Sequence, residues 1–528
     1  MSAVCVDLLR RSARTFADRE AVWCRGESLT FRELFDRSCR LANGLLDLGL
    51  APQDRVALLG GNSLRSVEEL TGLSMGNFVR VPLHARNTAH QHRYMLEHVR
   101  ARALIVSEEL YEPLAPHLED LEALEHVIVH GRGGTVSYSE LLGRADDADP
   151  AVPVAPDDIS HVAFTSGTTG RPKAAVHTHG GQMGVTAQYT LALPRFDEHD
   201  RFLAVAPLSH AASTLFFTAV AAGATTVVEP KFDPDALAAT LAERPVTFTL
   251  MVPTMIQALL DVVELDPARL NLGSVRALVS TGAQLHEATA RRASEELGPI
   301  LYNSYGQVEG VPAAMMTPSD FARAAERDGR KFRSVGRPGM LVRVRIVDDA
   351  GRDLPPYEHG EIAIDTPGNM RGYWEAPEAS ASRFLDGFVL THDIGYLDDD
   401  GYLYVVDRKD DMIISGGFNI WPAEIEQAIA AHPDVVEVVV VGVPHPKWGQ
   451  TPWAAVVVRQ GATVSEAEIV DWCRERVGSM KKPTYVDLRL EPLPRSAVGK
   501  IPRRVVREEL LARAPDSTTS QNDRAPSR

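Results

Sequence analysis

Apolar residues follow two different spacings along the first part of this 528-residue chain. From Leu34 to Leu48 they recur at helical spacing, whereas the short apolar runs at 55–59 and 103–106 have the length of buried strands. Strands that alternate with helices in this way predict a layered α/β architecture with largely parallel sheets. Four further strand-like runs continue the alternation, at residues 202–207, 225–230, 246–253 and 275–280.

After about residue 335 the pattern changes to short alternating strands separated by turns rich in Asp and Gly, which predicts a β-rich subdomain. These strands are expected at residues 342–348, 359–365 and 401–407. An acidic stretch at 409–411 then leads into another unit that contains both helices and strands. The clearest strands of that unit are expected at 435–443 and 451–458.

The length of the chain exceeds that of one compact core, so we expect at least two domains and an α/β fold class. A large N-terminal domain of layered α/β sheets, with the β-rich subdomain, is expected over residues 1–408. A small α+β C-terminal domain is expected over 409–513. Residues 514–528 are polar without apolar periodicity, so we expect a disordered tail there.

The net charge of −16 argues against a nucleic acid or an anionic membrane as the main partner, although it allows a local basic pocket for a phosphorylated ligand. The four cysteines are scattered without metal-ligand spacing, so disulfides and zinc sites are not expected, which suits a reducing cytoplasm. No apolar run has the length of a signal peptide core or a membrane span. We therefore expect a soluble cytoplasmic protein.

Residues 165–173 read T-S-G-T-T-G-R-P-K and predict a loop that binds polyphosphate. Gly167 and Gly170 allow a tight turn with inward N–H groups, and Lys173 adds a positive charge at its edge. The spacing differs from a Walker A loop, in which the lysine directly follows the second glycine. A plain surface loop is the alternative. The remaining candidate phosphate ligands are Thr165, Ser166, Thr168 and Thr169.

Five motifs in order resemble the adenylate-forming superfamily of acyl-CoA synthetases, nonribosomal peptide synthetase adenylation domains and luciferases, over most of the chain. They are residues 165–173, Y-G-Q-V-E (305–309), T-H-D-I-G (391–395), residues 407–426, and P-R-S-A-V-G-K-I (494–501). The resemblance implies an enzyme that activates a carboxylic acid with ATP and Mg²⁺ and transfers the acyl group to coenzyme A (CoA).

The resemblance also implies roles for individual residues. Glu309 matches the magnesium ligand, and a hard cation that bridges phosphates prefers a carboxylate. Lys500 matches the lysine that stabilises charge on the transferring oxygens. Asp393 and Arg408 match ribose contacts, because an acceptor-only carboxylate suits two vicinal hydroxyls. Further ATP or AMP contacts are expected at Gly282, Ala283, Gln284, Asn303, Tyr305 and Gly306.

His210 matches the histidine at the entrance of the acyl pocket, and we include it among the catalytic candidates. No acidic residue lies between Ala206 and Ala222, which disfavours an amino acid substrate. The small residues 211–213 and the apolar residues 215–217 suggest a roomy hydrophobic pocket for a fatty, aryl or bulky polycyclic acid. Other expected pocket residues are Ala211, Ser213, Thr281, Gly282 and Tyr305, although Tyr305 could instead be a core residue.

The resemblance implies a hinge at Asp410, about which the C-terminal domain rotates so that one site runs two half-reactions. In its second position that domain presents the loop Ser415, Gly416 and Gly417, where two glycines would allow a close approach to pantetheine. A separate H-x-H pair, His177 and His179, has no third ligand nearby in sequence and is interpreted as a pair at a strand edge.

Three residues depart from the pattern of the superfamily: Val308 in place of Thr, His392 in place of Gly, and Ala174 in place of Gly. Loss of a threonine hydroxyl bond to phosphate costs about 1–3 kcal/mol if nothing replaces it. None of the three changes removes a charged catalytic group, so we expect activity.

The leading hypothesis is an ATP-dependent acyl-CoA synthetase that is a monomer or a homodimer. The nearest alternative is an enzyme that loads a carrier protein instead of CoA, followed by a luciferase-like oxygenase. A regulatory nucleotide-binding protein with an inactive site is disfavoured because Lys173, Glu309, Asp393 and Lys500 are all present.

Overall fold

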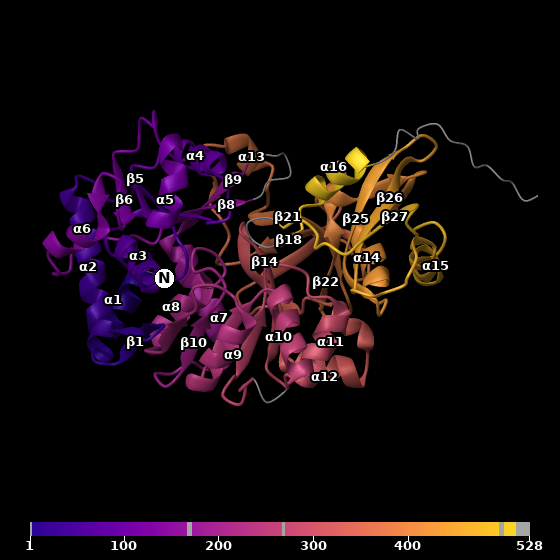
Figure 1. Ribbon diagram of the computed structural model, residues 1–528, viewed down its shortest axis with the longest axis horizontal. Helices are drawn as coiled ribbons and strands as arrows, with labels where there is room; N and C mark the ends of the chain where they lie inside the picture. Colours follow the sequence, from indigo (N-terminus) through magenta and orange to yellow (C-terminus); the bar gives the residue numbers. More distant parts are fainter. Residues whose placement is uncertain (1–2, 166–171, 267–269, 496–500, 514–528) are drawn as a thin grey trace, which may run out of the picture. The chain divides into compact units, whose positions relative to one another are not determined.

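The computed structural model describes residues 3–165, 172–266, 270–495 and 501–513, and Figure 1 labels its elements in chain order. The chain forms two compact units. The first comprises the residues up to Thr391 together with Tyr396–Tyr404. The second comprises His392–Gly395 and the described residues from Val405 onward. Together the described residues form four β-sheets.

The first sheet has the order β16-β15-β14-β13-β12-β10-β11-β1-β2. Its central strands, from β14 to β1, are parallel, and antiparallel strands flank them at both edges. The strands predicted at 202–207, 225–230, 246–253 and 275–280 are all in this parallel core, so those predictions are confirmed. The strands are β1 (Glu20–Cys24), β2 (Glu27–Thr30), β10 (Arg201–Ala204), β11 (Thr225–Val228), β12 (Phe248–Met251), β13 (Ala277–Ser280), β14 (Leu301–Gln307), β15 (Gly310–Met316) and β16 (Arg337–Pro338).

The second sheet has the order β19-β9-β8-β4-β3-β5-β6-β7 and is parallel from β8 to β7. The strands predicted at 55–59 and 103–106 are β3 and β5 of this sheet. Strands β8 and β9 form an antiparallel hairpin, and β19 extends the sheet beyond β9. The strands are β3 (Arg55–Leu59), β4 (Val79–Leu83), β5 (Ala103–Ser107), β6 (His126–His130), β7 (Val136–Ser137), β8 (Ile159–Thr165), β9 (Lys173–Thr178) and β19 (Gly372–Tyr373).

The third sheet forms the expected β-rich subdomain, with the order β17-β18-β21-β20 and β22 beside β21. The fourth sheet, in the second unit, has the order β24-β23-β26-β25 with β27 parallel to β26. The third sheet contains β17 (Arg343–Val347), β18 (Gly360–Asp365), β20 (Phe384–Leu385), β21 (Phe388–Leu397) and β22 (Leu403–Arg408). The fourth contains β23 (Ile413–Ser415), β24 (Phe418–Ile420), β25 (Val435–His445), β26 (Gly449–Val458) and β27 (Tyr485–Arg489).

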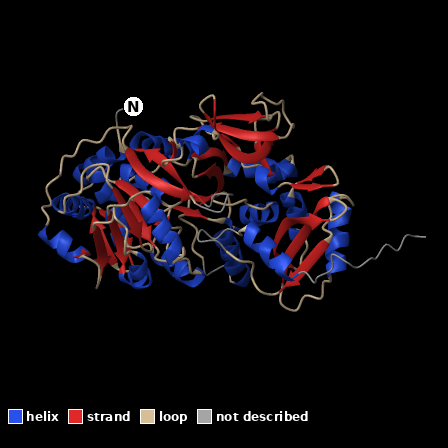
Figure 2. Cartoon of the chain, turned by 90° about the horizontal axis from the view of Figure 1, so that it is seen from above, coloured by secondary structure: helices blue, strands red, loops and turns tan. Residues whose placement is uncertain are grey.

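Helices alternate with most strands of the first two sheets, whereas the strands of the third sheet follow one another almost without helices. Figure 2 shows the helices in blue and the strands in red. None of the described helices is long and apolar enough to cross a membrane. The α-helices of the first unit are α1 (Cys5–Thr15), α2 (Phe31–Asp47), α3 (Leu64–Met75), α4 (Ala89–His98), α5 (Glu108–Leu114), α6 (Tyr138–Arg144), α7 (His179–Ala192), α8 (Ser213–Ala222), α9 (Pro234–Glu243), α10 (Pro253–Leu265), α11 (Glu287–Glu296), α12 (Pro318–Glu326) and α13 (Pro377–Ala381). Those of the second unit are α14 (Pro422–Ala430), α15 (Glu466–Val477) and α16 (Arg503–Arg513), and short 3₁₀ turns cover Ala115–His117, Gly329–Arg333 and Lys409–Asp411 (η4).

Helix α2 shows how local sequence sets an element that was predicted from apolar spacing. The Thr30 hydroxyl accepts a hydrogen bond from the Glu33 N–H at 3.2 Å, and the Glu33 carboxylate accepts one from the Thr30 N–H at 2.8 Å. This capping box satisfies two N–H groups that have no partner within the helix. Leu34, Leu41 and Leu45 are then fully buried on one face, which is the face that the periodicity predicted.

The side chains of the parallel strands β10, β12 and β13 alternate between two apolar cores. Phe202 and Phe248 face the core shared with α1, α2, α7 and α8, whereas Leu203 and Leu278 face the core on the opposite side of the sheet. Because both faces are covered, a ligand can approach the sheet only at the ends of its strands. In parallel α/β sheets, ligands bind outside the carboxyl ends.

Candidate functional site

Several predicted site residues follow the carboxyl ends of β10, β13 and β14, which lie at one edge of the first sheet. The Thr281 hydroxyl is buried and donates to the Ser304 carbonyl at 3.1 Å, which fixes the start of the loop after β13. Gly282 has a φ of +84°, which a residue without Cβ adopts without strain, and the next two loop residues are exposed. The other predicted residues here are Ala283 and Gln284 in the loop, buried Asn303 on β14, half-buried Tyr305, and Gly306.

The predicted phosphate loop connects the two strands of the β8–β9 hairpin. Thr165 and Lys173 are opposite each other at its base. The Lys173 ammonium lies 5.3 Å from the centre of the Tyr373 ring, a distance at which a cation and an aromatic face attract each other. Five predicted loop ligands lie outside the described residues, namely Ser166, Gly167, Thr168, Thr169 and Gly170.

Glu309 is buried between residues from different parts of the first unit. Its Oε1 accepts a hydrogen bond from the Tyr373 hydroxyl at 2.8 Å and lies 3.3 Å from Arg383 Nη2. Burial and the Glu309 carboxylate raise the pKa of Tyr373, so its hydroxyl stays protonated and donates. The Arg383 Nε is buried and has no hydrogen-bond partner among the described residues. Sequence reasoning missed Tyr373 and Arg383, because neither belongs to a motif that it used.

The Glu309 carboxylate fits a hard divalent cation that takes its other ligands from phosphate and water. Within the described ranges, no group of three or more His, Cys, Asp or Glu side chains is placed to hold a metal ion. Among the residues that the structure describes, the site therefore offers the Glu309 carboxylate rather than a complete cage. A Mg²⁺ ion held in this way commonly bridges a carboxylate and substrate phosphates.

His210, after β10 of the first sheet, contacts His84, after β4 of the second. Their rings lie edge to face, with centroids 5.1 Å apart. Burial lowers the pKa of each to about 4, so both are neutral at physiological pH. Asn62 joins the same two sheets: its Nδ2 donates to the Ala206 carbonyl at 3.0 Å, and its Oδ1 accepts from the Leu208 N–H at 2.8 Å. Neither His84 nor Asn62 was predicted from the sequence.

The remaining predicted acyl-pocket residues serve local structure as well. The Ser213 hydroxyl donates to the His210 carbonyl at 2.7 Å and Ala211 is half-buried against the core shared by α1 and α8. Residues 215–217 are fully buried in that core, so they support the region by packing. The buried cation Arg80 also lowers the pKa of His210, after burial itself and His84.

The predicted ribose residues Asp393 and Arg408 are joined by an ion pair, with Arg408 Nε 2.8 Å from Asp393 Oδ1. The preceding residue, His392, has a φ of +56°, which explains why glycine suits this position. Its Nδ1 lies 3.8 Å from Oδ2 of the predicted hinge residue Asp410, which belongs to η4. Lys500 lies outside the described residues.

The segment predicted to face pantetheine is the tight turn of the β23–β24 hairpin. Ser415 pairs with Phe418, and the two residues between them have φ of +57° (Gly416) and +84° (Gly417). Left-handed conformations at both central residues define a type of turn that favours glycine. The turn itself therefore accounts for both glycines.

Two of the departures from the superfamily occupy apolar positions. Val308 packs against Ala175, Met370 and Tyr373, and Ala174 is buried in the core of the second sheet. Both residues of the H-x-H pair are buried, and only His177 belongs to a strand, β9, because His179 is the first residue of α7. The strand-edge interpretation is therefore wrong for His179.

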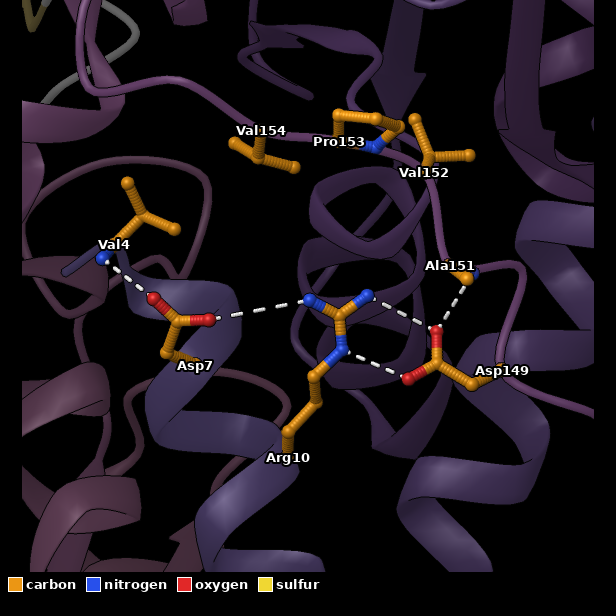
Figure 3. Close-up of a pocket in the computed structure, with 8 residues that line it drawn as sticks. All are labelled: Val4, Asp7, Arg10, Asp149, Ala151, Val152, Pro153 and Val154. Carbon is orange, nitrogen blue, oxygen red and sulfur yellow. Dashed lines mark hydrogen bonds and ion pairs between the residues drawn. The ribbon is translucent and has the colours of Figure 1, made fainter. Parts of the chain in front are cut away.

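One open cavity, of about 540 Å³, lies away from all of these residues. It is lined by Val4, Asp7, Arg10, Asp149 and residues 151–154. Figure 3 shows that its charged groups satisfy one another: Arg10 Nε is 2.8 Å from Asp149 Oδ2, and Arg10 Nη1 is 3.9 Å from Asp7 Oδ1. It contains none of the predicted site residues.

Comparison with known proteins identifies the family. The family described as "AMP-binding enzyme" matches residues 9–374, and "AMP-binding enzyme C-terminal domain" matches residues 424–500. The chain belongs to the AMP-binding enzyme family. This confirms the resemblance to the adenylate-forming superfamily and the α/β fold with a small C-terminal domain. As an AMP-binding enzyme, the protein is an AMP-forming acid–CoA ligase.

Individual AMP-binding enzymes resemble the chain over almost its whole length. A feruloyl-CoA synthase of an Amycolatopsis species is 36% identical over 94% of this chain and 97% of the relative. The indoleacetate–CoA ligase of Aromatoleum aromaticum is 34% identical over 92% of this chain and 94% of the relative. The crystal structure of ATP-bound MatB from Rhodopseudomonas palustris has a TM-score of 0.85 and 28% identity, over 96% of this chain and 98% of that one.

Proposed function

We propose that the enzyme activates a hydrophobic carboxylic acid, with an aryl acid as the first candidate, through an acyl-adenylate, and then transfers the acyl group to CoA. The observation that carries this proposal is the half-buried, neutral, edge-to-face contact of His84 and His210 where the two α/β sheets meet. Aromatic groups favour such edge and face contacts.

The charges around His210 support an acid without an ammonium group. Burial is the main cause of its lowered pKa, and the groups that lower the pKa further are His84 and Arg80, neither of which is an acid. Neither of these described groups offers a carboxylate to an α-ammonium group, which would instead approach a buried cation, and that is costly at low dielectric. The activities named for the similar feruloyl-CoA synthase and indoleacetate–CoA ligase agree with an aryl acid.

Basic groups of the first unit suit the phosphates of ATP. Lys173 lies at the base of the predicted phosphate loop. The Arg383 Nη2 lies beside Glu309, and its Nε has no hydrogen-bond partner among the described residues. Glu309 would hold Mg²⁺, which when bound neutralises charge on the phosphates. Such preorganised charge stabilises pyrophosphate as it departs.

Residues of the second unit would complete the reaction. Asp393 would accept hydrogen bonds from the ribose hydroxyls while its ion pair with Arg408 holds its orientation. Lys500 would stabilise the carboxylate and the α-phosphate during adenylation. In this proposal the domains span 1–408 and 409–513, with the hinge at Asp410 and the Ser415–Gly417 turn beside pantetheine.

The decisive experiment is a panel of acids assayed for pyrophosphate release with ATP and Mg²⁺, with and without CoA. The panel would include ferulate, indoleacetate, medium and long fatty acids, a bulky bicyclic acid and several amino acids. Aryl acids should give the fastest release, and CoA should accelerate it by allowing turnover. A preference for amino acids would contradict the acid class. Release that holo-carrier protein accelerates and CoA does not would favour a carrier-loading enzyme.

A further inference from the structure

Arg80 is a buried cation on β4 of the second sheet, and it is only 6% exposed. Its neighbours Val79 and Val81 pack in the apolar core on one face of that sheet, so Arg80 lies on the opposite face. The register places Arg80 beside His161 of β8, which in turn pairs with His177 of β9. These three side chains therefore form a polar row across one face of the sheet.

The charge of Arg80 has no counter-charge among the described residues. No hydrogen bond or ion pair joins its guanidinium to any residue that the structure describes, and within that part of the chain only the Cys5 thiol of α1 raises its pKa. Burial raises the pKa of the Cys5 thiol to about 12 and lowers that of Arg80 to about 10. At physiological pH the thiol is therefore neutral and the guanidinium charged. A buried charge without a partner is costly.

The histidines of the row do not supply the missing charge. The rings of His161 and His177 are stacked, with centroids 4.7 Å apart. Burial lowers the pKa of both residues, to about 4 for His177, and the charge of Arg80 lowers both further. Both rings are therefore neutral at physiological pH. His161 is half-buried, so the row remains partly accessible to a small group.

His179, the first residue of α7, adds a second polar group without a partner. It is 1% exposed, and neither of its ring nitrogens has a hydrogen-bond partner among the described residues. Burial lowers its pKa to about 4, and the nearby charge of Arg80 lowers it too, so the ring is neutral and carries one N–H donor. Buried polar groups are nearly always hydrogen-bonded. Arg80 and His179 therefore lack acceptors that water or a ligand must supply.

Arg80 lies on the same strand as one of the two contacting histidines at the acyl site. His84 follows β4, and its ring contacts His210. Four residues at about 3.3 Å each place the Cα atoms of Arg80 and His84 about 13 Å apart. Because ligands of parallel sheets bind at the carboxyl ends of the strands, Arg80 is deeper in the first unit than His84. An acid that reacts near the strand ends would extend its other end towards Arg80.

We propose that Arg80 is a specificity-determining residue at the far end of the acyl site, where its guanidinium binds a second carboxylate of the acid substrate and His179 donates a further hydrogen bond. This inference rests on the proposed function and narrows the substrate to an acid with carboxylates at both ends. A carboxylate fits because it accepts two parallel hydrogen bonds from a guanidinium. It also supplies the negative charge that the described residues around Arg80 lack.

The test compares matched aryl acids with the full-length enzyme, ATP, Mg²⁺ and CoA. The acids are cinnamate, its derivatives with a second carboxylate on C4 of the ring, attached directly or through one or two CH₂ groups, and the neutral amide of each derivative. The kcat/KM of pyrophosphate release is measured for every acid. Wild type should prefer at least one diacid over its amide tenfold or more. Equal values for each diacid and its amide would overturn the proposal.

Variants show whether Arg80 causes that preference. Arg80→Met should lower kcat/KM at least hundredfold for the preferred diacid and less than threefold for cinnamate. Arg80→Lys keeps the charge but not the paired donors, so it should retain part of the preference. Arg65→Met, at an exposed position on α3, should change no value more than twofold. An equal loss for all acids, or an unchanged preference in Arg80→Met, contradicts the assigned role.

Thermal unfolding with α,β-methylene-ATP measures binding of the acid without catalysis. The preferred diacid should raise the Tm of wild type more than its amide does, whereas the two rises should be equal in Arg80→Met. If Arg80→Met does not fold, Arg80→Gln and Arg80→Lys carry the same comparisons. If wild type releases no pyrophosphate with any acid, including those of the broader panel, the proposed function fails and this inference falls with it. If wild type is active but does not distinguish diacids from their amides, only the inference fails.

Discussion

Arg408 Nε lies 2.8 Å from Asp393 Oδ1, which joins the two residues expected to contact ribose. The Asp393 side chain is 6% exposed and the Arg408 side chain 42%, so the arginine covers a buried carboxylate. A charge-assisted hydrogen bond of this kind fixes the orientation of both groups. The carboxylate therefore has a defined orientation before any nucleotide binds.

Asp393→Asn is expected to raise the KM for ATP about thirtyfold, or about 2 kcal/mol, because the amide loses the charged acceptor and its pair with Arg408. The KM for CoA should stay unchanged. Pyrophosphate release at varied ATP concentration measures the effect. Asp399→Asn, on an exposed turn, is the control. An unchanged KM for ATP would remove Asp393 from the nucleotide site.

Tyr373→Phe keeps the ring beneath Lys173 but removes the hydrogen bond to Glu309. The carboxylate then loses one constraint on its orientation, worth about 1 kcal/mol. The Mg²⁺ concentration for half-maximal pyrophosphate release should rise about fivefold. Tyr402→Phe, whose hydroxyl donates to Asp320 instead, should leave the Mg²⁺ dependence unchanged. Identical Mg²⁺ curves for both variants would show that Glu309 does not act through the metal.

His392→Gly should stabilise the protein by about 0.5–1 kcal/mol, because glycine adopts the left-handed conformation without the cost of a Cβ atom. The contact of His392 with Asp410 is long and partly exposed, so its loss offsets little of this gain. His392→Ala keeps the strain and loses the contact. Thermal unfolding should therefore rank the glycine variant above wild type and the alanine variant below it. The reverse order of the two variants would contradict the strain argument.

Stability should fall as the pH is lowered from about 6.5 towards 4, in part because of His177. Burial lowers the pKa of this residue to about 4, so in that range the unfolded chain binds a proton that the folded protein does not. At pH 5 this costs about 2 kcal/mol for a histidine with an ordinary unfolded pKa.

In His177→Leu, the loss of stability that His177 causes at low pH is absent. From pH 7 to pH 5 the variant should gain about 2 kcal/mol of stability relative to wild type. Denaturant unfolding at the two pH values measures the change. His199→Leu, at a side chain that is 77% exposed, serves as the control. Parallel pH profiles for His177→Leu and wild type would show that His177 titrates normally.

Much of the fold could be predicted because the signals are local. The runs at 55–59 and 225–230 are strands β3 and β11, since strand length and burial produce a pattern within a few residues. The two glycines of the β23–β24 turn were also recognisable from the local sequence. The sequence analysis attributed them to an approach to pantetheine, but the left-handed backbone of the turn is enough to explain why glycine occurs at both positions.

The surroundings of the candidate site could not be predicted in this way. Tyr373 is 64 residues from Glu309, and His84 follows a different sheet from His210. Their contacts arise from the packing of two sheets, and no periodicity along the chain encodes that packing. The same holds for Arg80, whose charge acts on His179 and His210 of other elements.

By itself the sequence determined the order of strands and helices, the family, and the charged residues that each motif contains. It did so because hydrogen-bonded elements and short motifs depend on neighbours in the chain. Only the tertiary structure decided which groups surround a charged side chain: Tyr373 and Arg383 around Glu309, and neutral histidines around Arg80. Burial creates these relationships, because a charged group removed from water must find its partners wherever the fold brings them.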